Sequence, residues 1–197
     1  MTESTNLTAF ARLKAGKGAS REERRQNRLP AVIYGNGETP DLISLCPREF
    51  TKEMYKAGFY TRLFNIDVNG KSQQTIVKAL QLHPVSDKAI HVDFLRVTSK
   101  TMVTVSVPIK FINDTLSPGL KRGGVLNVVH HEIRIVCRAD AIPHSLDIDL
   151  TGVEFGHAFH LDVIQLPEGA KLASADKGYT IATILAPKVE AAAAETK

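Results

Sequence analysis

Residues 63–82 read LFNIDVNGKSQQTIVKALQL, and this stretch predicts a β-hairpin. Its strands are Leu63–Val68 and Ser72–Leu82, and the intervening Asn69-Gly70 favours a type I′ turn, because both central residues of that turn need a positive φ. Turn-bounded apolar runs around the hairpin predict more strands at Leu7–Lys14, Ala31–Tyr34, Leu42–Leu45 and Ile90–Val97, and a helix at Pro47–Ala57. About six short strands are enough for a small closed or nearly closed barrel.

The rest of the sequence predicts a second all-β unit. The chain restarts after residue 100 with short strands between Gly-, Pro- and Asp-rich breaks, at Met102–Ile109, Val125–Val129, Glu132–Cys137, Leu146–Leu150 and Thr180–Leu185. We therefore expect a mainly β protein with short helices. It has three parts: a barrel domain at residues 1–98, a second β domain at 99–187 and a flexible Ala-rich tail at 188–197.

A basic stripe precedes the hairpin, formed by Arg21, Arg24, Arg25 and Arg28. Their spacing of i, i+3, i+4 and i+7 predicts one face of a short helix. Ser20 and Glu23 have the form of a capping box, which predicts that this helix begins at Ser20, and Pro30 is expected to end it. Four arginines beside a Gly-Lys-Gly loop suit an array of phosphates, so nucleic acid is the first partner to consider. The alternative is a solvated helix with Glu–Arg pairs.

The excess positive charge lies in the first half of the chain. Residues 1–98 carry a net charge of +5 and residues 99–197 a net charge of −1, against +4 for the whole chain. A basic half joined to a nearly neutral one suggests that the first half docks on a polyanion while the second has another role.

Cysteine content and hydropathy exclude several protein classes. The two cysteines, Cys46 and Cys137, are far apart and indicate neither a disulfide framework nor a zinc site. The first residues contain no apolar stretch of signal-peptide length, and no run of 18 apolar residues occurs. We expect a cytosolic protein without membrane spans.

Two polar motifs lie at the ends of strands that should be adjacent: Gln81-Leu82-His83-Pro84 and His91-Val92-Asp93-Phe94. Because side chains alternate along a strand, His91 and Asp93 point to the same face. Such a pair can form a structural hydrogen bond, bind a metal, act as a catalytic base or contact RNA. A metal site is disfavoured because a fourth ligand and a recognised spacing are missing.

Other motifs have simpler interpretations. His130-His131 and the pair His157 and His160 invite a zinc hypothesis, but neighbouring strand residues face opposite sides, so we expect exposed or hydrogen-bonded histidines. The glycine-rich stretches lack the Lys-Ser/Thr of a phosphate-binding loop and indicate turns. No arrangement of nucleophile and base predicts an enzyme, and no cofactor is expected.

The chain resembles a known family in four motifs taken together. They are Gly16–Arg21 (GKGASR), Leu29–Gly35 (LPAVIYG), Gln81-x-His83-Pro84 and His91–Phe94 (HVDF). This combination is similar to the bacterial large-subunit ribosomal proteins that bind 5S rRNA, in their longer two-domain form, the general stress protein CTC type. Val107-Pro108, Gly123–Leu126, Ile142-Pro143 and Leu166–Gly169 resemble the C-terminal β domain of that form.

The resemblance implies a six-stranded barrel similar to the anticodon-binding domain of glutaminyl-tRNA synthetase, docked on loop E of 5S rRNA. Neighbouring ribosomal RNA and proteins are the other partners that it implies, with no membrane and no small-molecule substrate. The chain departs from the family at Glu22-Glu23, where more arginine is common, so the later arginines are expected to carry more of the phosphate binding.

The predicted RNA-binding residues fall into two groups. Phosphate contacts are expected from the basic side chains Lys14, Lys17, Arg21, Arg24, Arg25 and Arg28. Directional hydrogen bonds are expected from Tyr34, Gln81, His83, His91 and Asp93, while Ser20 is a helix cap or a backbone contact. Two alternatives stay open: a stress-related protein-interaction module with only general polyanion binding, and a metal-dependent hydrolase built on His83, His91 and Asp93.

Overall fold

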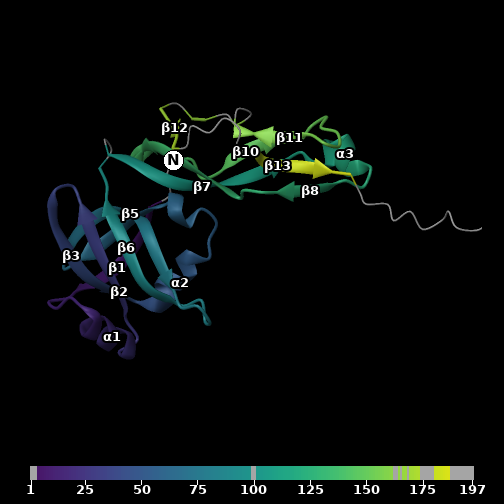
Figure 1. Ribbon diagram of the computed structural model, residues 1–197. Helices are drawn as coiled ribbons and strands as arrows, with labels where there is room; N and C mark the ends of the chain where they lie inside the picture. The colour runs from purple at the N-terminus through teal and green to yellow at the C-terminus, as the bar shows by residue number, and fades with distance from the viewer. Residues whose placement is uncertain are drawn as a thin grey trace, which may run out of the picture. The chain divides into compact units, whose positions relative to one another are not determined.

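A closed six-stranded β-barrel forms the N-terminal part of the computed structural model, which describes residues 4–98, 101–161, 164, 166, 167, 169–173 and 180–186. The barrel order is β1-β3-β2-β6-β5-β4, and Figure 1 shows these strands in purple to teal. Their bounds are β1 Ser4–Ala11, β2 Leu29–Gly35, β3 Glu38–Leu45, β4 Leu63–Val68, β5 Lys71–Leu82 and β6 Ala89–Arg96. Parallel pairing of β1 with β4 closes the barrel, with Ser4 opposite Leu63 and Ala9 opposite Val68.

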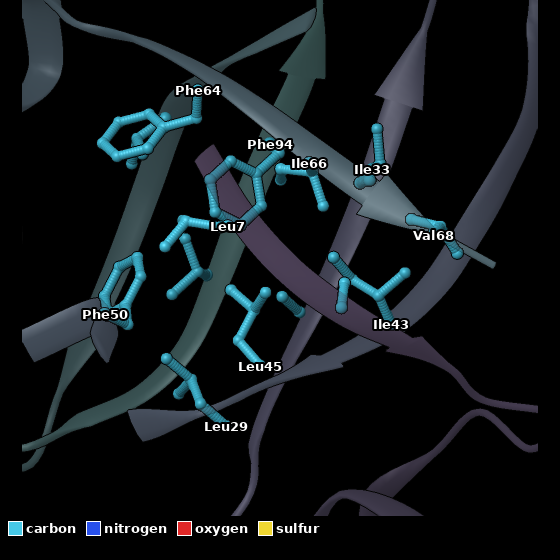
Figure 2. Close-up of a cluster of buried hydrophobic side chains, with 14 of the residues drawn as sticks. Leu7, Leu29, Ile33, Ile43, Leu45, Phe50, Phe64, Ile66, Val68 and Phe94 are labelled. Atoms are coloured by element: carbon cyan, nitrogen blue, oxygen red, sulfur yellow. The ribbon is translucent and has the colours of Figure 1, made fainter. Parts of the chain in front are cut away.

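Alternating side chains of these strands fill the barrel interior. Along β6, Val92 and Phe94 are fully buried, whereas His91 and Asp93, which alternate with them, are only partly covered. Figure 2 shows the resulting cluster, in which Leu and Ile side chains from several strands point into the barrel, with Phe94, Leu7 and Ile66 near its centre. The period of two along the strands therefore separates an apolar core from a polar outer face.

Two short helices accompany the barrel: α1 Lys17–Arg25 before β2, and α2 Pro47–Met54 after β3. Pro47 occupies the first turn of α2, where its missing N–H costs nothing. Phe50 projects from α2 into the barrel core and is fully buried. Its ring lies edge-on to Phe59, which belongs to the short 3₁₀ turn η1 Phe59–Thr61, and to Phe94, at centroid distances of 5.6 and 6.4 Å.

The turns of the barrel confirm the local sequence signals. Asn69 and Gly70 have φ values of 53° and 82°, as the predicted type I′ turn requires, and β4 pairs with β5 in register on either side. Gly35 ends β2 at a φ of 113°, and a Cβ there would lie 2.9 Å from Leu95 Cδ1. Both the backbone angle and the close approach of β6 therefore require glycine at this position.

An arginine is buried in the barrel wall. Arg96 is only 7% exposed, and its guanidinium donates to Asp41 Oδ2 at 2.6 Å, Gln73 Oε1 at 2.8 Å and the carbonyl of Thr39 at 3.1 Å. These bonds join β6 to β5 and β3. The pKa of Asp41 lies below its ordinary value, first because Gln73 donates to its carboxylate and then because Arg96 does so.

Two further sheets follow the barrel in sequence. A four-stranded sheet has the order β10-β7-β9-β12, with β7 Met102–Ile112, β9 Glu132–Arg138, β10 Leu146–Asp149 and β12 Lys171–Leu172. A three-stranded sheet has the order β11-β13-β8, with β8 Val125–Val128, β11 Ala158–His160 and β13 Thr180–Leu185. Among the described residues of this region, the one α-helix is α3 Pro118–Lys121, between the 3₁₀ turns η2 Asp114–Leu116 and η3 Ala139–Ala141.

The predicted fold class, mainly β with an N-terminal barrel and a further β region, is confirmed. The short strands β11 and β12 were not predicted from the sequence. The chain divides into two compact units, one of residues 1–107, 134–144 and 167–173 and a second of the remaining segments. The predicted domain bounds 1–98 and 99–187 stay predictions, and the predicted tail 188–197 lies outside the described residues.

Candidate nucleic-acid interface

The helix that carries the basic stripe begins earlier than its capping pattern indicated. Gly16 is the N-cap of α1, with a φ of 107°, and the N–H of Ser20 donates to the Gly16 carbonyl at 3.0 Å. Ser20 therefore lies within the first turns, and the predicted Ser20 cap is wrong. A glycine that adopts a left-handed φ starts the helix without a side-chain cap.

The helix also ends earlier, at Arg25. Asn27 has a left-handed φ of 57°, which turns the chain before Pro30 is reached, and Pro30 lies in β2. The four arginines consequently do not share one helix: Arg21, Arg24 and Arg25 belong to α1, whereas Arg28 follows it. All four, like Lys14 and Lys17, are exposed.

Neighbouring side chains hold only part of this stripe. Arg25 pairs with Glu22 at 3.5 Å, and Arg28 stacks on the exposed ring of Phe10, with its Cζ 5.2 Å from the centroid. Arg21 and Arg24 have no carboxylate partner in the described part of the chain. The alternative of a solvated helix with Glu–Arg pairs therefore accounts for one pair, Arg25 with Glu22. The positive charge of the other three arginines is not compensated by a carboxylate in the described part of the chain.

Arg12 differs from the stripe because it belongs to the barrel wall. Its Nε donates to the Ile43 carbonyl at 2.8 Å and its Nη2 to the Ala31 carbonyl at 3.2 Å. Burial lowers the pKa of the guanidinium from its ordinary value, although Glu23 opposes this. We interpret Arg12 as a structural residue that ties the start of the α1 loop to β2 and β3.

Four of the predicted hydrogen-bonding residues come together on the outer face of three adjacent strands. Gln81 on β5 is the cross-strand partner of His91 on β6, and Asp93 lies two residues further along β6. β2 runs parallel to β6, with Tyr34 opposite Leu95 and therefore beside this row. We call Tyr34, Gln81, His91 and Asp93 the polar face.

Within the polar face, His91 and Asp93 are joined by a hydrogen bond of 2.8 Å between Nδ1 and Oδ1. The carboxylate accepts the Nδ1 proton, which leaves Nε2 of a neutral imidazole as an acceptor. Burial raises the pKa of the Tyr34 phenol above its ordinary value, and the nearby Asp93 carboxylate raises it further. Tyr34 is thus an uncharged donor on the same face as the Asp93 carboxylate.

His83 does not join this face. It opens the β5–β6 loop, where its Nδ1 accepts the backbone N–H groups of Val85 and Ser86, both at 3.3 Å. Because Nδ1 is an acceptor, the proton of the neutral ring lies on Nε2. The loop is closed by the N–H of His83 donating to the Lys88 carbonyl at 2.9 Å.

His83 instead lines a groove that sequence analysis did not predict. The groove has a volume of about 900 Å³, and its walls come from the end of α1, from α2 and from the β5–β6 loop. Five of its lining residues are cationic: Arg24, Arg28, Arg48, Lys52 and Lys88. We call it the basic groove. Arg48, Lys52 and Lys88 were missed because they are separated in sequence and no local motif links them.

The polar face does not have the composition of a metal or catalytic centre. No group of three or more His, Cys, Asp or Glu side chains suited to a metal occurs among the described residues.

Two histidines of the C-terminal part have identified contacts. His160 Nδ1 lies 3.4 Å from Thr180 Oγ1, and the His157 ring packs edge-on against Phe159 at a centroid distance of 5.0 Å. These contacts agree with the expectation of exposed or hydrogen-bonded histidines, since His157 is exposed and His160 has a hydrogen-bond partner. Cys137 is buried, which raises the pKa of its thiol, whereas Cys46 is exposed.

No helix in the described part of the chain is long and apolar enough to cross a membrane. The barrel presents exposed guanidiniums and ammoniums on and around α1, and a hydrogen-bonding face on β2, β5 and β6 that carries no cationic Lys or Arg side chain among its four residues. Cations that contact phosphates and neutral donors and acceptors that contact bases and ribose are the two components of an RNA interface.

Comparison with known proteins agrees with this chemistry. Residues 7–94 match the Ribosomal L25p family, and residues 102–188 match the C-terminal domain of ribosomal protein TL5. The large ribosomal subunit protein bL25 of Rhodospirillum rubrum is 50% identical over 98% of this chain and 94% of its own length. The chain belongs to the bL25 family. Proteins of the same name from Chelativorans sp. and Erythrobacter litoralis are 47% and 46% identical, each over 95% of this chain.

Membership of the bL25 family confirms the resemblance seen in the sequence motifs. It also confirms the predictions of a ribosomal, non-enzymatic protein located in the cytoplasm, because the family consists of structural proteins of the large ribosomal subunit. The hydrolase alternative built on His83, His91 and Asp93 is wrong, since His83 lies in a separate loop and the family has no enzymatic role.

Proposed function

We propose that this bL25 protein binds 5S rRNA at its loop E and acts there as a non-catalytic part of the large ribosomal subunit. The observation that carries the proposal is the polar face, an ordered set of directional donors and acceptors on the strands of the barrel that also carries the cationic α1. A general polyanion site needs only the cations. An ordered face of this kind is useful only when the partner presents groups in one defined arrangement.

The two parts of the surface have different tasks. Lys14, Lys17 and the arginines of the stripe contact phosphates and set the orientation of the protein on the RNA. An internal loop of non-Watson–Crick pairs reshapes an A-form helix, so that base edges and 2′-hydroxyls in the wide minor groove become readable. Tyr34 then donates its O–H, His91 Nε2 accepts, and the Asp93 carboxylate accepts from a hydroxyl or an exocyclic amino group.

Two further assignments belong to this proposal. Residues 1–98 form the RNA-binding domain, and residues 99–187 form a second β domain that contacts neighbouring ribosomal RNA or protein. The uneven distribution of charge supports this division, because all of the net positive charge lies in the first 98 residues. Ser20 takes no part in capping, so its hydroxyl on α1 is assigned to an RNA backbone contact.

The test is an electrophoretic mobility shift of the full chain with 5S rRNA, with a loop E mutant of it and with an unrelated duplex of equal length. We expect tight binding to 5S rRNA that is lost with the loop mutant. Equal binding to all three RNAs would contradict the proposal and favour the alternative, a stress-related interaction module with general polyanion binding.

A further inference from the structure

The basic groove combines charge and apolar surface in an unusual way. Its cations stand on both walls, with Arg48 and Lys52 on α2 and Lys88 on the β5–β6 loop. Apolar atoms of Leu29, Pro47, Ala89 and Ile90 contribute to its lining. No acidic side chain lines it, and none of its five cations forms an ion pair within the described part of the chain.

Uncompensated like charges around one concavity repel each other and are stabilised when an anion enters. The lining also restricts the shape of that anion. At about 900 Å³, the groove lies in the size range of small-molecule pockets, which is far too small for a duplex and large enough for one or two nucleotides. The apolar surface suits the face of a base, which a fully paired helix keeps stacked and does not expose.

We propose that the basic groove binds unpaired nucleotides of the RNA, next to the duplex that the polar face contacts. The inference rests on the proposed function and extends its surface across α2. Arg24 and Arg28 connect the two regions, because they belong both to the stripe and to the lining of the groove. A strand that leaves the duplex at α1 passes these arginines and then meets Arg48 and Lys52 on one side and Lys88 on the other.

His83 gives the groove a directional contact. Its Nδ1 is occupied by two backbone N–H groups of its own loop, so its Nε2–H is the ring atom that remains to donate. Asn27 and Ser86 also line the groove and supply an amide and a hydroxyl. The groove therefore has cations for phosphates and a small number of neutral donors for a base edge or a ribose.

The experiment compares two RNAs and measures how the affinity of the full chain depends on salt. One RNA is a blunt duplex that contains loop E, and the other is the same duplex with three unpaired nucleotides added at each strand end in turn. If the groove engages two extra phosphates, the salt slope of log K for one extended RNA is steeper by about 1.4, since each single-strand contact adds about 0.7.

Variants locate this gain. Arg48→Ala with Lys52→Ala removes the two cations that α2 contributes to the groove, and Lys88→Ala removes the cation of the β5–β6 loop. None of the three side chains belongs to the barrel core, so the core stays unchanged in these variants. We expect the double variant to lose the increase in salt slope that the unpaired nucleotides cause, and Lys88→Ala to lose about half of it. The affinity of both variants for the blunt duplex should stay unchanged. The matched control, Lys56→Ala with Lys71→Ala, removes two exposed lysines outside the groove and should keep the full gain.

Each outcome has a separate meaning. Equal salt slopes for the blunt and all extended RNAs with the unmodified chain would overturn the inference. An increase in salt slope that survives in both groove variants, or that disappears in the control variant, would overturn it as well. If the blunt loop E duplex binds no better than an unrelated duplex, the proposed function itself fails. The two failures are therefore distinguished by different RNAs.

Discussion

At the scale of single residues, the buried Arg96 makes the stability of the barrel depend on pH. Hydrogen bonds from Gln73 and Arg96 keep the pKa of Asp41 below its unfolded value. A lowered folded pKa adds stability above the unfolded pKa, near 3.8, and this contribution disappears as the pH falls through the folded pKa. The free energy of unfolding should therefore decrease in acid, below about pH 4.

The substitution Asp41→Asn tests this linkage. We expect a loss of about 1 kcal/mol at pH 7, because a charge-assisted hydrogen bond to a partly exposed carboxylate is removed from Arg96. The variant should also lose less stability than the unmodified chain between pH 5 and pH 3, as measured by urea unfolding. Asp87→Asn, in the exposed β5–β6 loop, is the control for the change in charge. Parallel pH curves for Asp41→Asn and the unmodified chain would exclude Asp41 as the titrating group.

Asp93 allows a second prediction at this scale. Asp93→Asn keeps the shape of the side chain but removes its negative charge and replaces one acceptor oxygen by an amide donor, which weakens the hydrogen bond from His91 Nδ1 and the acceptor capacity offered to the RNA. Affinity for loop E RNA should fall about 5- to 30-fold, or roughly 1–2 kcal/mol, while the salt slope stays the same, because no phosphate contact is lost. Binding to an unrelated duplex should not weaken. A change in slope, or an equal loss with every duplex, would contradict the assignment of Asp93 to directional contacts.

Residue-scale prediction from sequence succeeded where two residues share a strand. His91 and Asp93 were expected on one face, and they form a hydrogen bond there, because the side-chain period of two is a local property of strands. His83 was grouped with them because of its neighbour Gln81, but it begins a loop and turns its Nδ1 to its own backbone. Strand β5 ends at Leu82, so Gln81 still lies on the strand and His83 does not. The end of a strand is poorly predicted from the local sequence pattern.

At the scale of elements, α1 carries the cations that contact phosphates. Arg24→Ala with Arg25→Ala leaves the barrel core intact, since no residue of α1 is buried. We expect affinity for 5S rRNA to fall by a few kcal/mol and the salt slope to fall by about 1.4–1.8, the contribution of two phosphate contacts. Filter binding between 50 and 200 mM salt measures both. Unchanged affinity would exclude the stripe as a docking surface.

The short helix α2 has a structural task as well, which Phe50 performs. Its ring packs against Phe59 and Phe94 in the barrel core. Phe50→Ala should destabilise the barrel by about 3–5 kcal/mol, as removal of a buried aromatic ring leaves a cavity. Chemical denaturation measures this loss, with Tyr55→Ala on the exposed surface after α2 as the control. A loss below about 1 kcal/mol would contradict the central position of Phe50 in the core.

Elements were predictable where the signal is local. The Asn69-Gly70 turn and Pro47 at the start of α2 each depend on the φ preference of one or two residues. The limits of α1 were not predictable in the same way, because two start signals compete. Ser20 and Glu23 fit a capping box, yet Gly16 adopts the left-handed φ that begins the helix one turn earlier.

At the scale of the whole molecule, barrel closure determines which predicted residues meet. β1 joins β4 in parallel across more than fifty residues of sequence, and no local pattern encodes that pairing. The basic groove has the same origin, because its walls come from three segments that only the closed barrel brings together. The sequence thus named the exposed arginines, though not their division between α1 and the segment after it, and all four residues of the polar face, whereas the groove required the tertiary structure.

The uneven charge of the chain leads to a prediction for the intact protein. If about five phosphates are contacted, with slopes between roughly −0.7 and −0.9 for each, affinity for 5S rRNA should fall about 10²- to 10³-fold between 50 and 200 mM salt. The structure supports a number near five, because six basic side chains on and around α1 are exposed and one of them, Arg25, has a carboxylate partner in the described part of the chain: Lys14, Lys17, Arg21, Arg24, Arg25 and Arg28. A titration of the full chain at four salt concentrations gives the slope.

The loop E mutant of the RNA is the control. Its remaining weak binding should keep a similar salt slope, with a lower affinity at every salt concentration. An affinity for 5S rRNA that does not depend on salt would exclude the stripe as the docking surface, whatever its specificity.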